Sequence, residues 1–166
     1  DMLRLADELR QEFDWIMIDS PAGIERGFRN AIAPADIVLV VTNPEVSAVR
    51  DADRIIGLVE AEEKGPPRLV INRIKPDMVR RGDMLSADDV LELLAIELIG
   101  MVPDDDAVVM NTNRGMPVVL DNRSRARQAF RNIAQRLQGE NVPFVEMNSN
   151  DGFFGKLARF IRPGGD

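Results

Sequence analysis

The strongest constraint on the fold is an alternation of short apolar runs with amphipathic helical patterns. The apolar runs occupy residues 15–18, 37–41, 69–71, 98–102 and 118–120. Continuous runs of this length are typical of parallel strands that are buried on both faces of a sheet. Helical patterns run through Leu5, Leu9 and Phe13 and occupy residues 46–63, 86–96 and 122–137. The sequence therefore predicts an α/β fold over residues 1–138, with a mainly parallel sheet flanked by helices.

An acidic residue, Asp19, follows the first apolar run, at the edge of an open α/β sheet where ligands bind. A carboxylate in this position can hold Mg²⁺ through water or orient an attacking water molecule. Gly23, four residues later, gives the backbone freedom to approach a phosphate. An ordinary turn of the Asp-Ser-Pro type explains the same residues, so both interpretations stay open.

Polar residues also follow the next three apolar runs. The amide of Asn72, which precedes Arg73, offers a donor and an acceptor together and can pair with a purine. Residues 103–106 (PDDD) either close a pocket for a base or cap the next helix. Residues 42–45 lead into a charged helix, for which a solvated first turn is a sufficient explanation. Turn chemistry explains each of these motifs taken alone.

The absence of two residue types limits the available chemistry. The 166 residues include no cysteine and no histidine. Disulfides, iron–sulfur clusters, thiolate chemistry, zinc sites and imidazole catalysis are therefore not expected. The net charge of −7 argues against general nucleic-acid binding. The sequence has no run of 18 apolar residues, so we expect no membrane-spanning helix.

The C-terminal residues form a separate pattern after a predicted linker at 139–150. On a helical wheel of residues 151–162, one arc of about 120° holds the large apolar side chains: Phe153, Phe154, Leu157, Phe160 and Ile161. The other side holds the cations Lys156, Arg159 and Arg162. This pattern favours a helix that lies in a membrane interface, and the alternative is a helix docked on the protein's own core. Residues 152–162 carry a net +3 and the rest of the chain −10, which favours the membrane.

A helix this short binds a membrane weakly, because it must also fold there. Two such helices held together bind far more tightly through their effective concentration. We therefore expect dimerisation to control membrane attachment.

Taken in order, these motifs resemble the MinD family of septum-site-determining ATPases. The resemblance rests on residues 18–25 (IDSPAGIE), 42–54 (TNPEVSAVRDADR) and 81–86 (RGDMLS), and on the amphipathic tail. It covers nearly the whole chain and implies a P-loop NTPase-like fold, ATP and Mg²⁺ as cofactors, and ATP hydrolysis. It also implies an ATP-dependent homodimer, attachment to anionic membrane lipids, recruitment of the division inhibitor MinC, and release by a MinE-type activator.

The resemblance assigns roles to individual residues. Asp19 would lie near Mg²⁺ and the attacking water, and Gly23 near the γ-phosphate. Three residues would frame the adenine, namely Asn72, Pro103 and Asp104, and Arg73 would also belong to the nucleotide-binding site. Asp51 and Asp53 would contact partner proteins. The membrane-binding residues would be Phe153, Phe154, Lys156, Leu157, Arg159, Phe160 and Ile161.

The sequence departs from the family in one respect. The family begins with a strand and a loop of the Lys-Gly-Gly-Val-Gly-Lys-Thr kind, whose amides and lysines hold the phosphates. No such loop occurs here, and neither does the switch I acid that follows it. Because that strand lies in mid-sheet in the family, we expect an N-terminally truncated sheet with unpaired edges and an exposed apolar face. We also expect no ATP hydrolysis by this chain alone.

Two other functions are weighed against this one. A ParA-type DNA-partitioning ATPase would need a basic surface, which the acidic body does not offer. A membrane-recruited binding module that acts without ATP is the second alternative. For the MinD-type function, the expected location is the cytoplasm and the inner face of the cell membrane, or the stroma and envelope for a plastid version.

Overall fold

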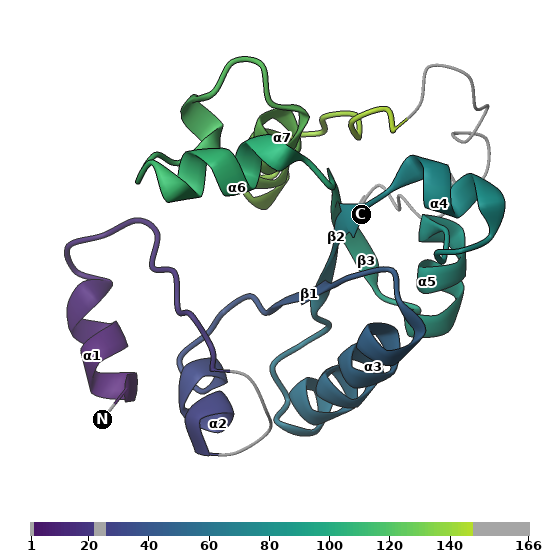
Figure 1. Cartoon of the computed structure of the whole chain (residues 1–166). Coiled ribbons are helices and arrows are strands. Elements are labelled where there is room, and N and C mark those ends of the chain that lie inside the picture. The colour runs from purple at the N-terminus through teal and green to yellow at the C-terminus, as the bar shows by residue number, and fades with distance from the viewer. Residues whose placement is uncertain (1, 22–25, 148–166) are drawn as a thin grey trace.

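The computed structural model describes residues 2–21 and 26–147, and it contains one three-stranded parallel sheet (Figure 1). The strands are β1 (Leu39–Thr42), β2 (Arg68–Ile74) and β3 (Glu97–Pro103), in the order β1-β2-β3. Val40 lies opposite Leu69, and Leu69 lies opposite Leu98. The helices are α1 (Met2–Leu9), α2 (Arg26–Ile32), α3 (Val46–Ala61), α4 (Pro76–Arg81), α5 (Ala87–Leu94), α6 (Asp106–Asn113), the 3-10 helix η1 (Val118–Leu120) and α7 (Arg125–Leu137). The predicted fold class is confirmed for the described residues.

Helices cover both faces of the sheet, as the continuous apolar runs predict. On one face, Leu69 and Ile71 of β2 pack in a buried cluster with residues of α3 and α5. On the other face, Val70 of the same strand packs with residues of α7. A Cβ at Gly100 of β3 would overlap the Ile133 side chain, so glycine allows the close approach of α7 to the sheet. Full burial of each large aliphatic side chain contributes about 1.5–3 kcal/mol, so these two layers hold the body together.

The start of α5 is fixed by a capping box. Ser86 accepts a hydrogen bond from the Asp89 amide, and the Asp89 carboxylate accepts one from the Ser86 amide. The hydrogen bonds from the Ser86 side chain and backbone lower the pKa of Asp89. The start of this helix therefore agrees with the predicted pattern at residues 86–96, with aspartate in place of the usual glutamate.

Two of the five predicted strands are not strands. Residues 15–18 form neither a helix nor a strand, and Trp15 and Met17 are 52% and 77% exposed. Residues 118–120 form the 3-10 helix η1 instead, directly after Pro117. In each case the run is apolar, but none of the described strands pairs with it.

Residues 140–147, here called the C-terminal strap, lie against the body although they fall within the predicted linker. Arg136 holds the strap to β3, because its guanidinium donates to the carbonyls of both Ile99 (2.9 Å) and Val142 (2.9 Å). The same guanidinium lies 3.9 Å from the centre of the Phe144 ring, which is buried in the α3–α5 cluster. Further hydrogen bonds to strap carbonyls come from Asn132 and Arg125.

Candidate functional site

The carboxyl ends of the three strands meet at one edge of the sheet, and loop contacts join them into a rim. The Asp104 amide after β3 donates to the Ile74 carbonyl at the end of β2 (2.9 Å). The Leu85 amide, before α5, donates to the Pro44 carbonyl after β1 (3.2 Å). These bonds hold the predicted polar residues of different strands at one edge, where open α/β sheets bind ligands.

A small charge cluster lies on this rim. The Asp104 carboxylate forms ion pairs with Arg73 (3.4 Å) and with Lys75 (3.2 Å). Ion pairs as exposed as these contribute only about 0–1 kcal/mol, so the cluster adds little to the stability of the fold. The structure thus brings two of the predicted site residues together, and it adds Lys75, which the sequence motifs did not single out.

The backbone of Arg73 is strained. Its φ is +56°, a left-handed conformation that costs a non-glycine residue about 1–2 kcal/mol. Arg73 lies in an irregular stretch of the β2–β3 ladder: Ile71 pairs with Met101 and Ile74 with Pro103, so β2 has one residue more than β3 between these pairs. Such strain is concentrated at functional sites in proteins, which supports a role for this rim.

The other two residues predicted to contact a base have different surroundings. Pro103 is buried at the end of β3. Asn72 is half-buried. Within the part of the chain that the structure describes, its side-chain carboxamide has no hydrogen-bond partner. A free amide beside a buried proline can offer a donor and an acceptor to a heterocycle.

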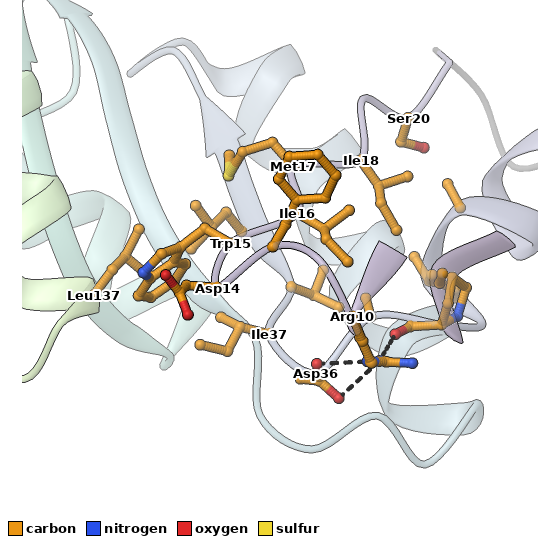
Figure 2. A pocket seen from close by; sticks show the side chains of 18 residues that line it. Arg10, Asp14, Trp15, Ile16, Met17, Ile18, Ser20, Asp36, Ile37 and Leu137 are labelled. Atoms are coloured by element: carbon orange, nitrogen blue, oxygen red, sulfur yellow. Dashed lines mark hydrogen bonds and ion pairs between the residues drawn. The ribbon is translucent and has the colours of Figure 1, made fainter. Parts of the chain in front are cut away.

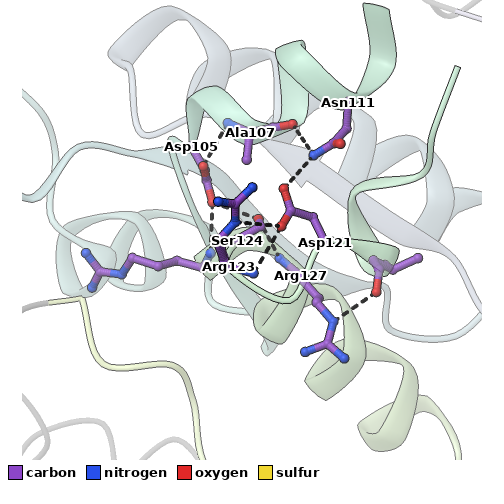
Figure 3. A network of polar contacts seen from close by, with 9 residues as sticks. Asp105, Ala107, Asn111, Asp121, Arg123, Ser124 and Arg127 are labelled. Carbon is purple, nitrogen blue, oxygen red and sulfur yellow. Dashed lines mark hydrogen bonds and ion pairs between the residues drawn. The ribbon is translucent and has the colours of Figure 1, made fainter. Parts of the chain in front are cut away.

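Asp105, next along the chain, has a structural role (Figure 3). Its carboxylate caps α6 by accepting from the Ala107 amide (2.9 Å). It also accepts from the Ser124 hydroxyl (2.8 Å) and from two amides in the first turn of α7, those of Arg125 and Ala126. Burial opposes ionisation, but these four hydrogen bonds together lower the pKa of Asp105. Of the two interpretations of residues 103–106, helix capping therefore accounts for Asp105.

The remaining predicted site residues are not joined to this rim. Asp19 is exposed directly after residues 15–18, and in residues 2–21 and 26–147 no ion pair or hydrogen bond links its side chain to the rim. Asp51 and Asp53 are exposed on α3. Gly23 and the seven predicted membrane-binding residues lie outside the described residues. The described residues contain no group of three or more carboxylates that could hold a metal ion, and none of their helices is long and apolar enough to cross a bilayer.

A cavity of about 300 Å³, here called the edge cavity, lies between residues 13–18 and residues 31–39 (Figure 2). Its lining is largely apolar and includes Trp15, Ile16, Ile37 and Leu137. Arg10 lies at this site, where its guanidinium contacts the Asp36 carboxylate (3.1 Å) and the Pro34 carbonyl (2.6 Å). These two contacts tie the end of α1 to the segment that leads into β1.

Comparison with known proteins gives a consistent set of relatives. Residues 1–93 match the family described as "Cellulose biosynthesis protein BcsQ". The chain is 51% identical to the septum site-determining protein MinD of Synechocystis over 146 residues, 87% of this chain and 55% of the relative. It is 50% identical to the MinD of Bacillus subtilis over 159 residues, 95% of this chain and 59% of the relative. The chain thus spans a little over half the length of these curated relatives.

Solved structures agree with the sequence comparison. The MinD cell division protein of Aquifex aeolicus superposes with a TM-score of 0.83 at 46% identity, covering 87% of this chain and 62% of that one. The MinC:MinD complex of the same organism gives a TM-score of 0.80 at 46% identity, covering 86% and 61%. The MinD of Pyrococcus horikoshii, solved with Mg-ADP, gives 0.72 at 24% identity, covering 82% and 55%, which shows the fold alone.

Proposed function

The chain belongs to the ParA/MinD family of septum site-determining proteins, and we propose that it is part of a membrane-associated ATPase that regulates the placement of the division septum. The identity of about one half with MinD proteins over most of this chain is the observation that carries the proposal. In this role, ATP would drive dimerisation, and the dimer would bind the membrane and recruit a division inhibitor.

In the nucleotide-binding role, the rim at the strand ends would hold the adenine. The unpaired amide of Asn72 would contact the base edge, and the buried Pro103 would support it. The pairing of Arg73 with Asp104 would fix the two strand ends. Asp19 would hold Mg²⁺ through water and orient the attacking water, while Gly23 would approach the γ-phosphate. Mg²⁺ would neutralise phosphate charge during hydrolysis.

This chain by itself is proposed to be inactive as an ATPase. The sequence contains no glycine-rich loop with lysine to surround the phosphates. An adenine rim without a phosphate site binds nucleotide weakly, because the phosphates carry most of the charge that a protein recognises. Nucleotide binding and dimerisation would then require a phosphate-binding loop of this kind.

Partner and membrane contacts use other surfaces. Asp51 and Asp53 are exposed on α3 and are available to a basic partner surface, in this proposal a MinC-type inhibitor and a MinE-type activator. The MinC:MinD complex of Aquifex aeolicus supports a MinC-type partner. The amphipathic pattern of residues 151–162 supports attachment to anionic lipids at the inner face of the membrane.

One alternative function has a specific observation in its favour. A membrane-recruited module that binds partners without ATP would need only α3 and the C-terminal tail. The exposed acidic residues of α3 and the amphipathic pattern of residues 151–162 fit this alternative. A DNA-partitioning ATPase fits less well, because the net charge of −7 repels DNA.

Co-sedimentation with vesicles of anionic lipid tests the membrane role. We expect the chain to sediment with the vesicles and Phe154→Glu to lose at least about tenfold in affinity, because a charge would enter the apolar face. Leu120→Glu is the matched control, since Leu120 is a 68% exposed apolar residue outside the tail, and it should bind like the unmodified chain. Equal binding by both variants would contradict the membrane role of the tail.

A further inference from the structure

Polar and apolar side chains are inverted on α6 and in the residues that follow it. The buried residue of α6 is polar, Asn111, whereas Val109 and Met110 of the same helix are 63% and 52% exposed. Of the 15 large hydrophobic side chains that are exposed in the described residues, five lie close together in the sequence: Val109, Met110, Met116, Val119 and Leu120. Exposed apolar side chains that gather in this way, rather than scatter singly, mark an interaction site.

Hydrogen bonds hold these five side chains in one preformed region, here called the α6–η1 surface. The Met116 amide donates to the Asn111 carbonyl (2.9 Å), and the Asn111 carboxamide donates to the Asp121 carboxylate (2.9 Å). From α7, Nε of Arg127 donates to the Val119 carbonyl (3.0 Å; Figure 3). The 3-10 helix η1 is therefore fixed to α6 and to α7. A surface that is fixed before binding loses little conformational freedom when a partner arrives.

The α6–η1 surface lies in a basic part of an acidic chain. Residues 106–131 contain five arginines and two aspartates, a net +3, although the whole chain carries −7. Among the residues that the structure describes, no ion pair or hydrogen bond engages the guanidinium groups of Arg114 and Arg131. The Arg123 side chain is 95% exposed and lies 4.0 Å from the Asp121 carboxylate. The region therefore offers apolar contacts together with three cations that are free or only loosely paired.

We propose that the α6–η1 surface binds an acidic amphipathic helix of a partner protein. The helix would lay its apolar face on the exposed valine, methionine and leucine side chains. Its carboxylates would meet Arg114, Arg123 and Arg131, since charges of opposite sign favour association. Arg131 follows one helical turn after Arg127, which contacts η1. Exposed methionines suit such a partner, because their flexible side chains adapt to the helix that they contact.

A helix fits this surface better than an extended segment. Residues 106–131 contain α6, η1 and the first half of α7, and within this range the structure has no strand whose edge could pair with a partner. A partner must therefore satisfy its own backbone hydrogen bonds, as a helix does.

A membrane and a second copy of this chain fit the surface less well. Helices that enter a membrane interface use Trp, Phe and Leu, but the α6–η1 surface has one leucine and no aromatic residue, whereas residues 151–162 contain three phenylalanines. Two copies paired through the same surface would bring arginines against arginines, which opposes self-association. Both occupants are nevertheless outcomes that the experiment must detect.

Fluorescence anisotropy tests the proposal with a labelled peptide of about 18 residues, which presents Leu at i, i+3, i+4 and i+7 and Glu at the other positions. We expect saturable one-to-one binding to the purified chain. A peptide with the same residues in scrambled order, and one with Lys in place of Glu, should bind at least about tenfold more weakly. Equal binding of the three peptides would overturn the proposal.

Two matched pairs of variants locate the binding site. Val109→Glu adds a charge to the α6–η1 surface, whereas Leu93→Glu adds the same charge at a similarly exposed position on α5 (61%). We expect Val109→Glu to weaken peptide binding at least about tenfold and Leu93→Glu to leave it unchanged. Arg123→Glu should also weaken binding, unlike Arg4→Glu on α1, where the side chain is 83% exposed. Circular dichroism checks that the variants fold, and equal effects within both pairs would contradict the proposed site.

The tail is also basic and amphipathic, so it is the main competitor for the peptide. Loss of binding in Phe154→Glu, with Val109→Glu unaffected, would assign the peptide to the tail and overturn the proposal. A homodimer in light scattering, or binding to anionic vesicles, that Val109→Glu abolishes while peptide binding persists would overturn it too. The inference uses neither nucleotide binding nor the tail, so a failure of the proposed function would leave it intact.

Discussion

At the scale of single residues, one carboxylate joins the starts of two successive α-helices, α6 and α7. Asp105 caps α6 and also accepts hydrogen bonds from Ser124 and the first turn of α7. Its pKa is lowered by these bonds. Asp105 therefore stabilises the folded protein when its carboxylate is ionised.

Replacing Asp105 with asparagine tests this link. At neutral pH, Asp105→Asn should lower the free energy of unfolding by about 1–2 kcal/mol, because an amide accepts these bonds less strongly. A group with a lowered folded pKa stabilises above its unfolded pKa of about 3.9 and loses that effect as the pH falls through the folded value. The difference between the two proteins in urea unfolding should therefore shrink below about pH 4.

The neighbouring Asp106 provides the control, since it is an exposed residue in the first turn of the same helix. Asp106→Asn should change the free energy of unfolding much less at neutral pH. A difference for Asp105→Asn that stays constant from neutral to acidic pH would contradict the assigned role.

Residues differ in how far the sequence alone could predict their roles. The capping box of Ser86 and Asp89 depends on a spacing of three residues, so a local pattern is sufficient. The contacts of Asp105 with Ser124 and of Asp104 with Lys75 depend on tertiary structure. The strain at Arg73 arises from an irregular ladder, which composition does not indicate.

At the scale of elements, the C-terminal strap is linked to β3 through Arg136 without forming a strand. Arg136 makes the connection, because it donates to the carbonyls of both Ile99 and Val142. The predicted linker at 139–150 thus contains residues that are fixed to the body.

Removing this arginine tests the strap. Arg136→Ala should lower the free energy of unfolding by about 1–3 kcal/mol, because two carbonyls lose their donor and the Phe144 ring loses a cation. Amide exchange in residues 140–147 should become faster. Arg131→Ala on the exposed side of the same helix is the control. Equal effects of the two substitutions would show that Arg136 does not hold the strap.

The sequence predicted a strand or a helix correctly where the described residues also contain the neighbouring element that it pairs with or packs against. Three apolar runs became β1, β2 and β3, and the patterns at 46–63, 86–96 and 122–137 became α3, α5 and α7. The run at 15–18 has the composition of a strand but no neighbouring strand to pair with among the described residues. The run at 118–120 is only three residues long and follows Pro117, and it forms a 3-10 turn.

At the scale of the whole molecule, the proposed functions lie in separate parts of the chain. The rim at the strand ends would contact a base, α3 would contact partner proteins, and the tail would bind the membrane. Within residues 2–21 and 26–147, β1 pairs with a strand on one side only, which is β2. The sequence motifs predicted this division of roles through the family resemblance, whereas the edge cavity emerged only from the structure.

The most direct test of this account is vesicle co-sedimentation of the chain with and without Mg-ATP. Because these 166 residues include no phosphate-binding loop, we expect the same fraction of bound protein under both conditions. The tail would then act without nucleotide control. Binding that rises with Mg-ATP would contradict the account, since it would show that this chain retains a working nucleotide switch.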